Sequence, residues 1–414
     1  MTDKLYELWN TALDRFYCPK TGLFYEFVTD ETAKAWDDLP TVSEIAKVYP
    51  NPCGWGTGME DAVMNGATAL DALIASHRIG VLPVSDMIKS FAEGVLDCQF
   101  NDKSLGFVAR SVSPYDGKSH YIESSRDQYT HFVYSLLRYY FSDLSDASTK
   151  ERIRNALVAV AEKCKREVIP ENDFNMLRED GSIGKVNKMW GDIGAHERMR
   201  LPMFYLAAYK VSGDAGYFEL YRKYRDEALE KSLDYNEKAS RLYCALQMMC
   251  SLKLVYEYDE DENFKSKLSP LMNRLADYAE EKVLENSVDF SKPERKAQLD
   301  YAFKPWRSVN MHDDEFGTYR YLNSGQSELK ENVAFYPVRE VGEGAMLAAM
   351  CPQRRVSDDV LAALVRMADA IDVKTHSSVY SILYMPCAYA LCMENRMNAD
   401  EKHFSDSKEE NGKE

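Results

Sequence analysis

Acidic, basic and aromatic residues are concentrated immediately before several long apolar segments of this chain. The three clearest clusters are Pro52–Asp61, Glu123–His131 and Trp190–Pro202. Two weaker ones, Arg339–Gly344 and Lys374–Ser378, are equally consistent with ordinary helix caps. Clusters of this composition can bind sugars, because aromatic faces stack on pyranose rings and charged side chains bind hydroxyl groups. A pair of carboxyl groups can also cleave a glycosidic bond when one is protonated and the other is ionised.

The first cluster combines a glycine-rich turn with two consecutive acidic residues, Glu60 and Asp61. Glycines allow the backbone to approach a ligand closely, and Trp55 offers a flat apolar surface. Helix capping explains the pattern equally well, since Thr57 and Glu60 have the spacing of a capping box. We treat Glu60 and Asp61 as candidate catalytic residues and Trp55 as a candidate sugar platform.

The second cluster contains Arg126, Asp127 and His131 at the start of an apolar segment. On a helix that begins near Ser125, Asp127 and His131 are four residues apart and share a face. Acids in a first turn also stabilise a helix through its dipole, but capping alone does not explain so dense a polar cluster. Asp127 is therefore a candidate catalytic residue, and Arg126 and His131 are candidate substrate ligands.

The third cluster contains Asp192, His196, Glu197 and Arg198, with Trp190 just upstream. Glu197 would begin an almost wholly apolar helix, which makes it a candidate catalytic residue. The histidine and glutamate lack the second histidine of the H-E-x-x-H zinc signature. We therefore expect no zinc hydrolase, and we expect the flanking Trp190, His196 and Arg198 to contact substrate.

Further candidates lie near the starts of later helices or in a long loop. Arg241 and His376 immediately precede apolar segments, and Trp306 and His312 lie in the loop 304–325. This loop is long enough to lie across the clusters as a lid, and long loops in compact domains are often functional. A plain solvated acidic loop is the alternative.

Hydrophobic periodicity predicts twelve helices. They span approximately 3–16, 57–78, 84–97, 127–142, 148–166, 195–211, 214–231, 238–256, 262–285, 340–351, 357–372 and 378–393. Their connections alternate between long and short, which predicts helical hairpins whose long loops open at one end. Segment 242–256 is apolar nearly all round and segment 149–166 has a charged stripe, which distinguishes buried from outer helices. We predict an all-α fold, an (α/α)6 barrel, with a solenoid of tetratricopeptide type as the alternative.

Composition is consistent with one domain over residues 1–397, followed by a charged tail, 398–414, that we expect to be disordered. The net charge of −16 argues against nucleic-acid and anionic-membrane partners. The nine cysteines are scattered without a C-x-x-C pair and are typical of small core residues in a reducing compartment. Met1–Arg15 lacks the apolar core of a signal peptide. We expect a cytoplasmic protein, or a periplasmic or secreted one if a leader was removed.

The segment WGDIGAHERMRLPMFYLAAYKVSGDAGYFEL, from Trp190 to Leu220, resembles part of the unsaturated glucuronyl and rhamnogalacturonyl hydrolases. In those families a catalytic acid begins an inner helix that reads roughly acid-x-x-x-M-x-x-P-F-L-A, followed by a hairpin G-D-x-x-Y. The resemblance places Glu197 at the catalytic acid. It covers about thirty residues. The first two clusters depart from the family pattern, which points to a distinct branch of the six-hairpin glycosidases acting on saturated glucuronides.

Our leading hypothesis is a glycoside hydrolase that acts on a terminal uronic acid of an oligosaccharide. Glu197 and Asp127 are the first candidates for general acid and base, with Glu60, Asp61 and Asp192 next. Arg126, Arg198 and Arg241 are candidates for the sugar carboxylate, because a guanidinium binds it in two places.

Three alternatives remain, and none of the readings requires a cofactor or a metal. A sugar 2-epimerase would use histidines such as His131, His196, His312 or His376 as acid and base. A polysaccharide lyase would use Tyr129 and His131. A non-catalytic carbohydrate-binding barrel would bind through Trp55, Trp190 and Trp306.

Overall fold

The structure is a computed structural model that describes residues 1–84, 87–289, 311–313, 319–321, 335–374, 376 and 378–411. Trp306 lies outside the described residues, together with most of the loop 304–325. His312 falls within the short strand β7 (Met311–Asp313).

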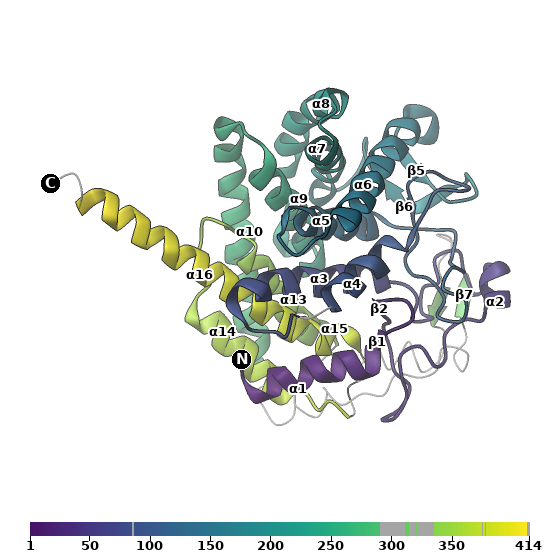
Figure 1. Cartoon of the computed structure of the whole chain (residues 1–414), viewed down its shortest axis with the longest axis horizontal. Helices are drawn as coiled ribbons and strands as arrows, with labels where there is room; N and C mark the ends of the chain where they lie inside the picture. The colour runs from purple at the N-terminus through teal and green to yellow at the C-terminus, as the bar shows by residue number, and fades with distance from the viewer. Residues whose placement is uncertain are drawn as a thin grey trace.

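Apolar helices pack on one another in a closed inner ring, and Figure 1 labels them along the chain. Within the described part of the chain the ring has six positions, occupied by α3 (Ala62–Ile79), α5 (Arg126–Phe141), α7 (Arg200–Ser212), α9 (Leu242–Tyr258), α13 (Phe335–Ala349) and the consecutive α15 (Val379–Ile382) and α16 (Tyr384–Asn411). Each helix packs on the next, and α16 packs on α3. This last contact closes the ring and distinguishes the fold from an open solenoid.

A second layer of helices covers the ring from outside. These helices are α1 (Asp3–Thr11), α4 (Met87–Leu96), α6 (Ala147–Glu167), α8 (Ala215–Ser232), α10 (Glu262–Asp289) and α14 (Asp358–Ala370). Helix α4 packs on α3, α6 on α5 and α7, α8 on α7, α10 on α9 and α13, and both α14 and α1 on α16. The chain is therefore an (α/α)6 barrel, as the alternation of buried and charged-stripe helices predicts.

Burial agrees with the expected division into inner and outer helices. Helix α9, which covers the segment expected inside, buries residues on several faces, including Leu246, Met249 and Leu252. Every residue of α3 from Ala62 to Ser76 is buried, as expected for a helix enclosed on all sides. Outer helix α6 instead buries one face, including Ile153, Leu157 and Val160, and exposes charged residues such as Arg152 and Arg154 on the other. All nine cysteines are free and eight are buried, which agrees with their interpretation as core residues.

Short antiparallel hairpins lie in the long connections that lead into the inner helices. They pair β1 (Tyr17–Cys18) with β2 (Leu23–Phe24), β3 (Gln99–Phe100) with β4 (Phe107–Val108), β5 (Asn175–Leu177) with β6 (Ile183–Lys188), and β7 with β8 (Tyr319–Tyr321). The short helix α2 (Val42–Ala46) begins with a capping box formed by Thr41 and Glu44. Hydrophobic periodicity did not predict these elements, because they are too short for an alternating or helical pattern to stand out from the surrounding loop.

Several helix starts differ from the prediction. Helix α9 begins at Leu242 instead of 238, and α13 begins at Phe335 instead of 340. Two further differences concern the acidic clusters. Residues 57–61 form a turn and α3 begins at Ala62, because Gly54, Gly56 and Gly58 adopt φ angles of 71°, 81° and 89°. Such angles are left-handed and incompatible with an α-helix. Similarly, the segment from 195 begins as a single 3-10 turn, Ala195–Glu197, before α7 starts at Arg200. Both changes place the acidic residues in turns ahead of the helices.

The expected disordered tail is helical as far as Asn411, where the described residues end, because α16 continues through 398 without a break. Polar contacts hold the beginning of this extension to the barrel. Asn398 accepts a hydrogen bond from Arg78 at 2.8 Å, and Asp400 pairs with Arg355 at 2.8 Å. In the described residues we find no helix long and apolar enough to cross a membrane.

We expect the buried Arg138 to be essential for stability. Arg138 pairs with Asp71 and, at 3.3 Å, with Glu394, and all three side chains are largely buried. Changing Arg138→Met should cost about 3–5 kcal/mol in the free energy of unfolding, because it leaves two buried carboxylates unpaired. Arg152→Met, which removes an exposed pair with Asp97, should cost below about 1 kcal/mol. Denaturant unfolding measures both, and equal losses would contradict the expectation.

Candidate active site at the amino ends of the inner helices

The turn that carries Glu60 and Asp61 is anchored by a residue from the N-terminal segment. One carboxyl oxygen of Glu26, Oε1, accepts hydrogen bonds from the backbone N–H groups of both Glu60 and Asp61, the latter at 2.8 Å. The Ser111 hydroxyl donates to the Met59 carbonyl at 2.7 Å. The backbone immediately before α3 is therefore fixed by two separate loops.

The side chain of Asp61 is held by donors from two other inner helices. Gln128 of α5 donates to Oδ1 at 2.7 Å, and the Tyr380 hydroxyl of α15 donates to Oδ2 at 2.6 Å. Both carboxylate oxygens are thus oriented, and Asp61 lies where the first, second and last inner helices meet. Ring closure between α16 and α3 makes this meeting possible.

A buried arginine faces both acids. Nη1 of Arg110 lies 3.6 Å from Glu60 Oε1 and 3.8 Å from Asp61 Oδ1. These distances allow charge attraction but exceed those of a hydrogen bond. Burial raises the pKa of Glu60 to about 8, the neighbouring negative charge of Asp61 adds to the rise, and Arg110 offsets it only in part. Glu60 is therefore protonated at neutral pH, although its side chain is 20% exposed.

Asp127 is in the opposite electrostatic situation. Arg200, which is buried, donates to Asp127 Oδ1 at 3.1 Å, and a second nitrogen of Arg200 donates to Gln247 at 2.7 Å. Burial would raise the pKa of Asp127, but the positive charges of Arg200 and Arg126 outweigh it, so the pKa lies below its usual value. Arg110 also lowers this pKa, so the Asp127 and Glu60 sites share one cation. With 34% of its side chain exposed, Asp127 is accessible and ionised.

Glu197 is engaged in a helix-start structure. Its Oε2 accepts the Gly194 N–H at 2.8 Å, and its Oε1 pairs with Arg126 at 2.6 Å. The side chain is only 8% exposed. Arg126 in turn donates to the Lys188 carbonyl at 3.1 Å. Both oxygens of Glu197 thus have partners. Glu197 and Arg126 together hold the turn before α7 against the start of α5 and the end of β6.

The remaining candidates from the third cluster do not converge on one point. Asp192 is exposed. Trp190 is buried and packs edge-on against Tyr224, with ring centroids 4.8 Å apart. Arg198 donates to the Gly191 carbonyl within its own loop. These contacts explain Trp190 and Arg198 as packing and loop-stabilising residues.

The other predicted ligands occupy varied positions. Trp55 is half-buried in the glycine-rich turn, where Asn51 bonds its backbone N–H and carbonyl at 3.0 Å each. Arg241 is exposed at the N-cap of α9. His376 is fully buried, and its backbone N–H donates to the Asp372 carbonyl at 2.9 Å. Of the three, Arg241 and Trp55 are accessible from solvent.

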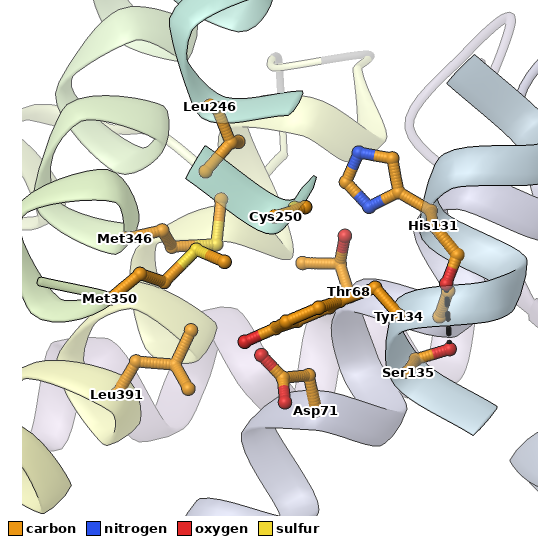
Figure 2. A pocket seen from close by; sticks show the side chains of 11 residues that line it. Thr68, Asp71, His131, Tyr134, Ser135, Leu246, Cys250, Met346, Met350 and Leu391 are labelled. Carbon is orange, nitrogen blue, oxygen red and sulfur yellow. Dashed lines mark hydrogen bonds between the residues drawn. The ribbon is translucent and has the colours of Figure 1, made fainter. Parts of the chain in front are cut away.

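Two of the candidate histidines are neutral at pH 7. Burial lowers the pKa of both His131 and His196 to about 4. Figure 2 shows His131 lining a small cavity between α3, α5, α9 and α13 with Thr68, Tyr134 and Cys250. Its volume of about 20 Å³ admits a water molecule but no sugar ring. A histidine acid–base pair working near pH 7 is therefore not favoured by these environments.

A further ion pair completes the cluster around Asp61. Arg339 of α13 pairs with the buried Glu343 at 2.6 Å and lies 4.1 Å from the centre of the Tyr380 ring. It thus fixes the phenol that donates to Asp61. In the described residues no group of three His, Cys, Asp or Glu side chains is arranged to hold a metal ion.

Several residues of this cluster were not singled out from the sequence. They are Glu26, Arg110, Gln128, Gln247 and Tyr380. Gln247 did leave a signal, because it is a lone amide within an apolar helix, where a polar group needs a partner. Gln128 lies within the second cluster. Glu26 and Arg110 lie in loops, where periodicity gives no information about direction.

Comparisons with known proteins give little to set beside this geometry. No protein-family model matches the chain, and no curated protein matches it. A solved structure, the GH76A alpha-1,6-mannanase from Salegentibacter sp. HEL1_6, is similar with a TM-score of 0.45 and 11% sequence identity, over 95% of this chain and 98% of that one.

We expect Glu60 to destabilise the protein at alkaline pH. Because its pKa is raised on folding, the folded protein keeps a proton that the unfolded chain releases from about pH 4.5 upward, so stability falls as pH rises toward 8. Glu60→Gln removes this titration and should raise the melting temperature at pH 8 by about 1–3 °C, with less change at pH 5. Calorimetry at both pH values measures the difference in melting temperature from wild type. An equal fall in the melting temperature of Glu60→Gln at pH 5 and pH 8 would contradict this expectation.

Proposed function

We propose that this protein is a glycoside hydrolase that removes a terminal uronic acid from an oligosaccharide. The observation that carries the proposal is a pair of carboxyl groups in one cluster with opposite pKa shifts. Burial raises the pKa of Glu60 to about 8, whereas Arg200 and Arg126 overcome burial to lower that of Asp127. Environments that separate two carboxyl pKa values are characteristic of acid–base catalysis.

In the proposed reaction Glu60 is the general acid and Asp127 the general base. Protonated Glu60 donates its proton to the glycosidic oxygen, while ionised Asp127 removes a proton from the attacking water. Asp61 acts on Glu60 rather than on substrate, because its negative charge helps to keep Glu60 protonated. Arg200 and Gln247 hold Asp127 in place. This replaces Glu197 by Glu60 as the preferred acid, since both oxygens of Glu197 already have partners.

The uronic-acid preference rests on Arg241. A guanidinium can bind a sugar carboxylate in two places, and Arg241 is positioned for this by its location and exposure. Arg241 is exposed at the N-cap of α9, an inner helix that also carries Gln247. A local cation is needed because the chain has a net charge of −16, which repels an anionic sugar beyond a Debye length of about 8–10 Å.

We expect Glu60→Gln and Asp127→Asn each to lower kcat on an aryl glucuronide by about 10²–10⁴-fold with folding retained. The wild-type rate should fall above about pH 8, as Glu60 loses its proton. Asp192→Asn, which neutralises an exposed acid, should keep full activity. Steady-state kinetics over a panel of aryl glycosides, with circular dichroism for folding, measures these effects.

Full activity in both Glu60→Gln and Asp127→Asn would remove the assignment. Analysis of the reaction products distinguishes hydrolysis from the two alternative reactions. Hydrolysis releases a reducing sugar with an unchanged ring, an epimerase gives a new stereoisomer, and a lyase gives a double bond that absorbs in the ultraviolet.

We expect Arg241→Ala to lower kcat/KM on glucuronides. The loss should correspond to about 1.5–3 kcal/mol of transition-state binding, because charge-assisted hydrogen bonds to the sugar carboxylate are lost. The loss on the matching glucoside should be far smaller. Arg241→Lys keeps the charge without the planar fork and should give an intermediate result. Equal losses on both sugars would assign Arg241 to structure, and a wild-type preference for neutral glycosides would end the uronate proposal.

A further inference from the structure

Glu26 uses its side chain and both of its backbone polar groups at the candidate active site. It is 1% exposed and follows strand β2 in a loop, outside every inner helix. We propose that Glu26 is the positioning residue that sets the Glu60–Asp61 turn against Tyr380, acting through backbone hydrogen bonds without contact to substrate. The inference rests on the proposed role of Glu60.

The side chain of Glu26 fixes the acidic turn directly. Its Oε1 accepts hydrogen bonds from two consecutive backbone N–H groups, those of Glu60 and Asp61. These N–H groups precede α3 and would otherwise lack an acceptor at the helix start. Because both donors converge on one oxygen, the peptide plane between Glu60 and Asp61 cannot rotate without losing a bond. The directions of both carboxyl side chains follow from that plane.

The backbone of Glu26 extends the same anchor to two other segments. Its N–H donates to the Gly58 carbonyl at 3.3 Å, and its carbonyl accepts the Val379 N–H at 2.9 Å. The next residue, Phe27, forms a β-bridge with Ser378. Val379 begins α15, and Tyr380 follows it directly. Glu26 therefore joins the N-terminal segment, the acidic turn and the last inner helix.

These bonds form a closed circuit. Glu26 binds the Asp61 N–H, the Asp61 side chain accepts from Tyr380, and Val379, next to Tyr380, binds the Glu26 carbonyl. Such a circuit fixes Asp61 and Tyr380 relative to each other. Separate contacts would fix each of them only to its own segment. Displacing one member should alter the Asp61–Tyr380 hydrogen bond and, through the charge of Asp61, the protonation of Glu60.

The role requires an acceptor oxygen, not a negative charge. Burial raises the pKa of Glu26 well above its usual value, and the charges of Glu60 and Asp61 add to the rise. The neutral form is therefore favoured, and its carbonyl oxygen can accept both hydrogen bonds. Glutamine supplies the same oxygen on a side chain of the same length, while methionine fills similar space without it.

The first test compares Glu26→Gln with Glu26→Met. We expect Glu26→Gln to retain kcat within about threefold of wild type, and Glu26→Met to lose at least tenfold in kcat with KM nearly unchanged and the alkaline limb of the pH profile displaced. Loss of stability in Glu26→Met with unchanged kcat per folded molecule would overturn the proposal. An equal loss of kcat in both variants would also overturn it.

A second test leaves Glu26 in place, in case Glu26→Met does not fold. Val379→Pro removes the N–H that donates to the Glu26 carbonyl, at the first position of α15, where proline fits a helix. Ser378 before it is already extended, with φ −111° and ψ 130°, as proline requires. We expect Val379→Pro to lower kcat about tenfold. Val379→Ala keeps the N–H and removes two buried methyl groups, so it controls for lost packing. It should stay near wild type, and equal kcat in the two variants would overturn the proposal.

A third measurement does not depend on activity. The pKa of Glu60 can be obtained from the pH dependence of unfolding of each variant, compared with the same variant carrying Glu60→Gln. We expect Glu60 to keep its raised pKa in Glu26→Gln. In Glu26→Met and Val379→Pro we expect the pKa of Glu60 to differ from its value in the wild type. If no glycoside is cleaved but these shifts appear, the proposed function fails and the positioning role stands. An unchanged pKa in both Glu26→Met and Val379→Pro would overturn the positioning role.

Discussion

The site depends on one constraint, the crowding of three carboxyl groups, one buried and two partly buried, with Arg110 facing two of them. Glu26, Glu60 and Asp61 lie around one turn, and Arg110 approaches only Glu60 and Asp61. Like charges this close cannot all remain ionised away from water. Burial and the neighbouring charges raise the pKa values of Glu26 and Glu60, which favours their protonated forms. Asp61 is the one of the three whose carboxylate accepts hydrogen bonds from two side chains.

Closure of the helical ring supplies the groups that satisfy this constraint. Gln128 comes from α5, Tyr380 from α15 and Arg339 from α13, and all of them act on or beside Asp61. An open array of hairpins would bring α5 to α3 but would leave the last helices far away. Because α16 returns to α3, residues more than 300 positions apart in the chain, such as Asp61 and Tyr380, form a hydrogen bond.

Helix positions and the barrel could be predicted from sequence because both follow from periodicity and from the contrast between apolar and striped helices. The first three clusters were also located correctly at or just before helix starts, whereas Arg339–Gly344 lies inside α13, which begins at Phe335. Which acid has a raised pKa could not be predicted. Glu197 and Glu60 look alike in sequence, yet Arg126 and Gly194 bind the two oxygens of Glu197. The Gly56 backbone and Arg110 also act on Glu60, but they do not overcome the effect of burial and of Asp61 on its pKa. Glu26 and Arg110 were missed because loop conformation, not helical spacing, directs them.

The two sides of the site therefore differ in how their charges are balanced. Asp127 has a hydrogen-bonded arginine, and Glu60 has a carboxylate neighbour and an arginine at 3.6 Å. The first arrangement stabilises the ionised form and the second the protonated form. The protonated side is the costly one, because a buried acid held neutral opposes folding as the pH rises. Stability elsewhere must offset that cost, and the apolar interior of helices such as α3, buried from Ala62 to Ser76, is where a closed barrel provides it.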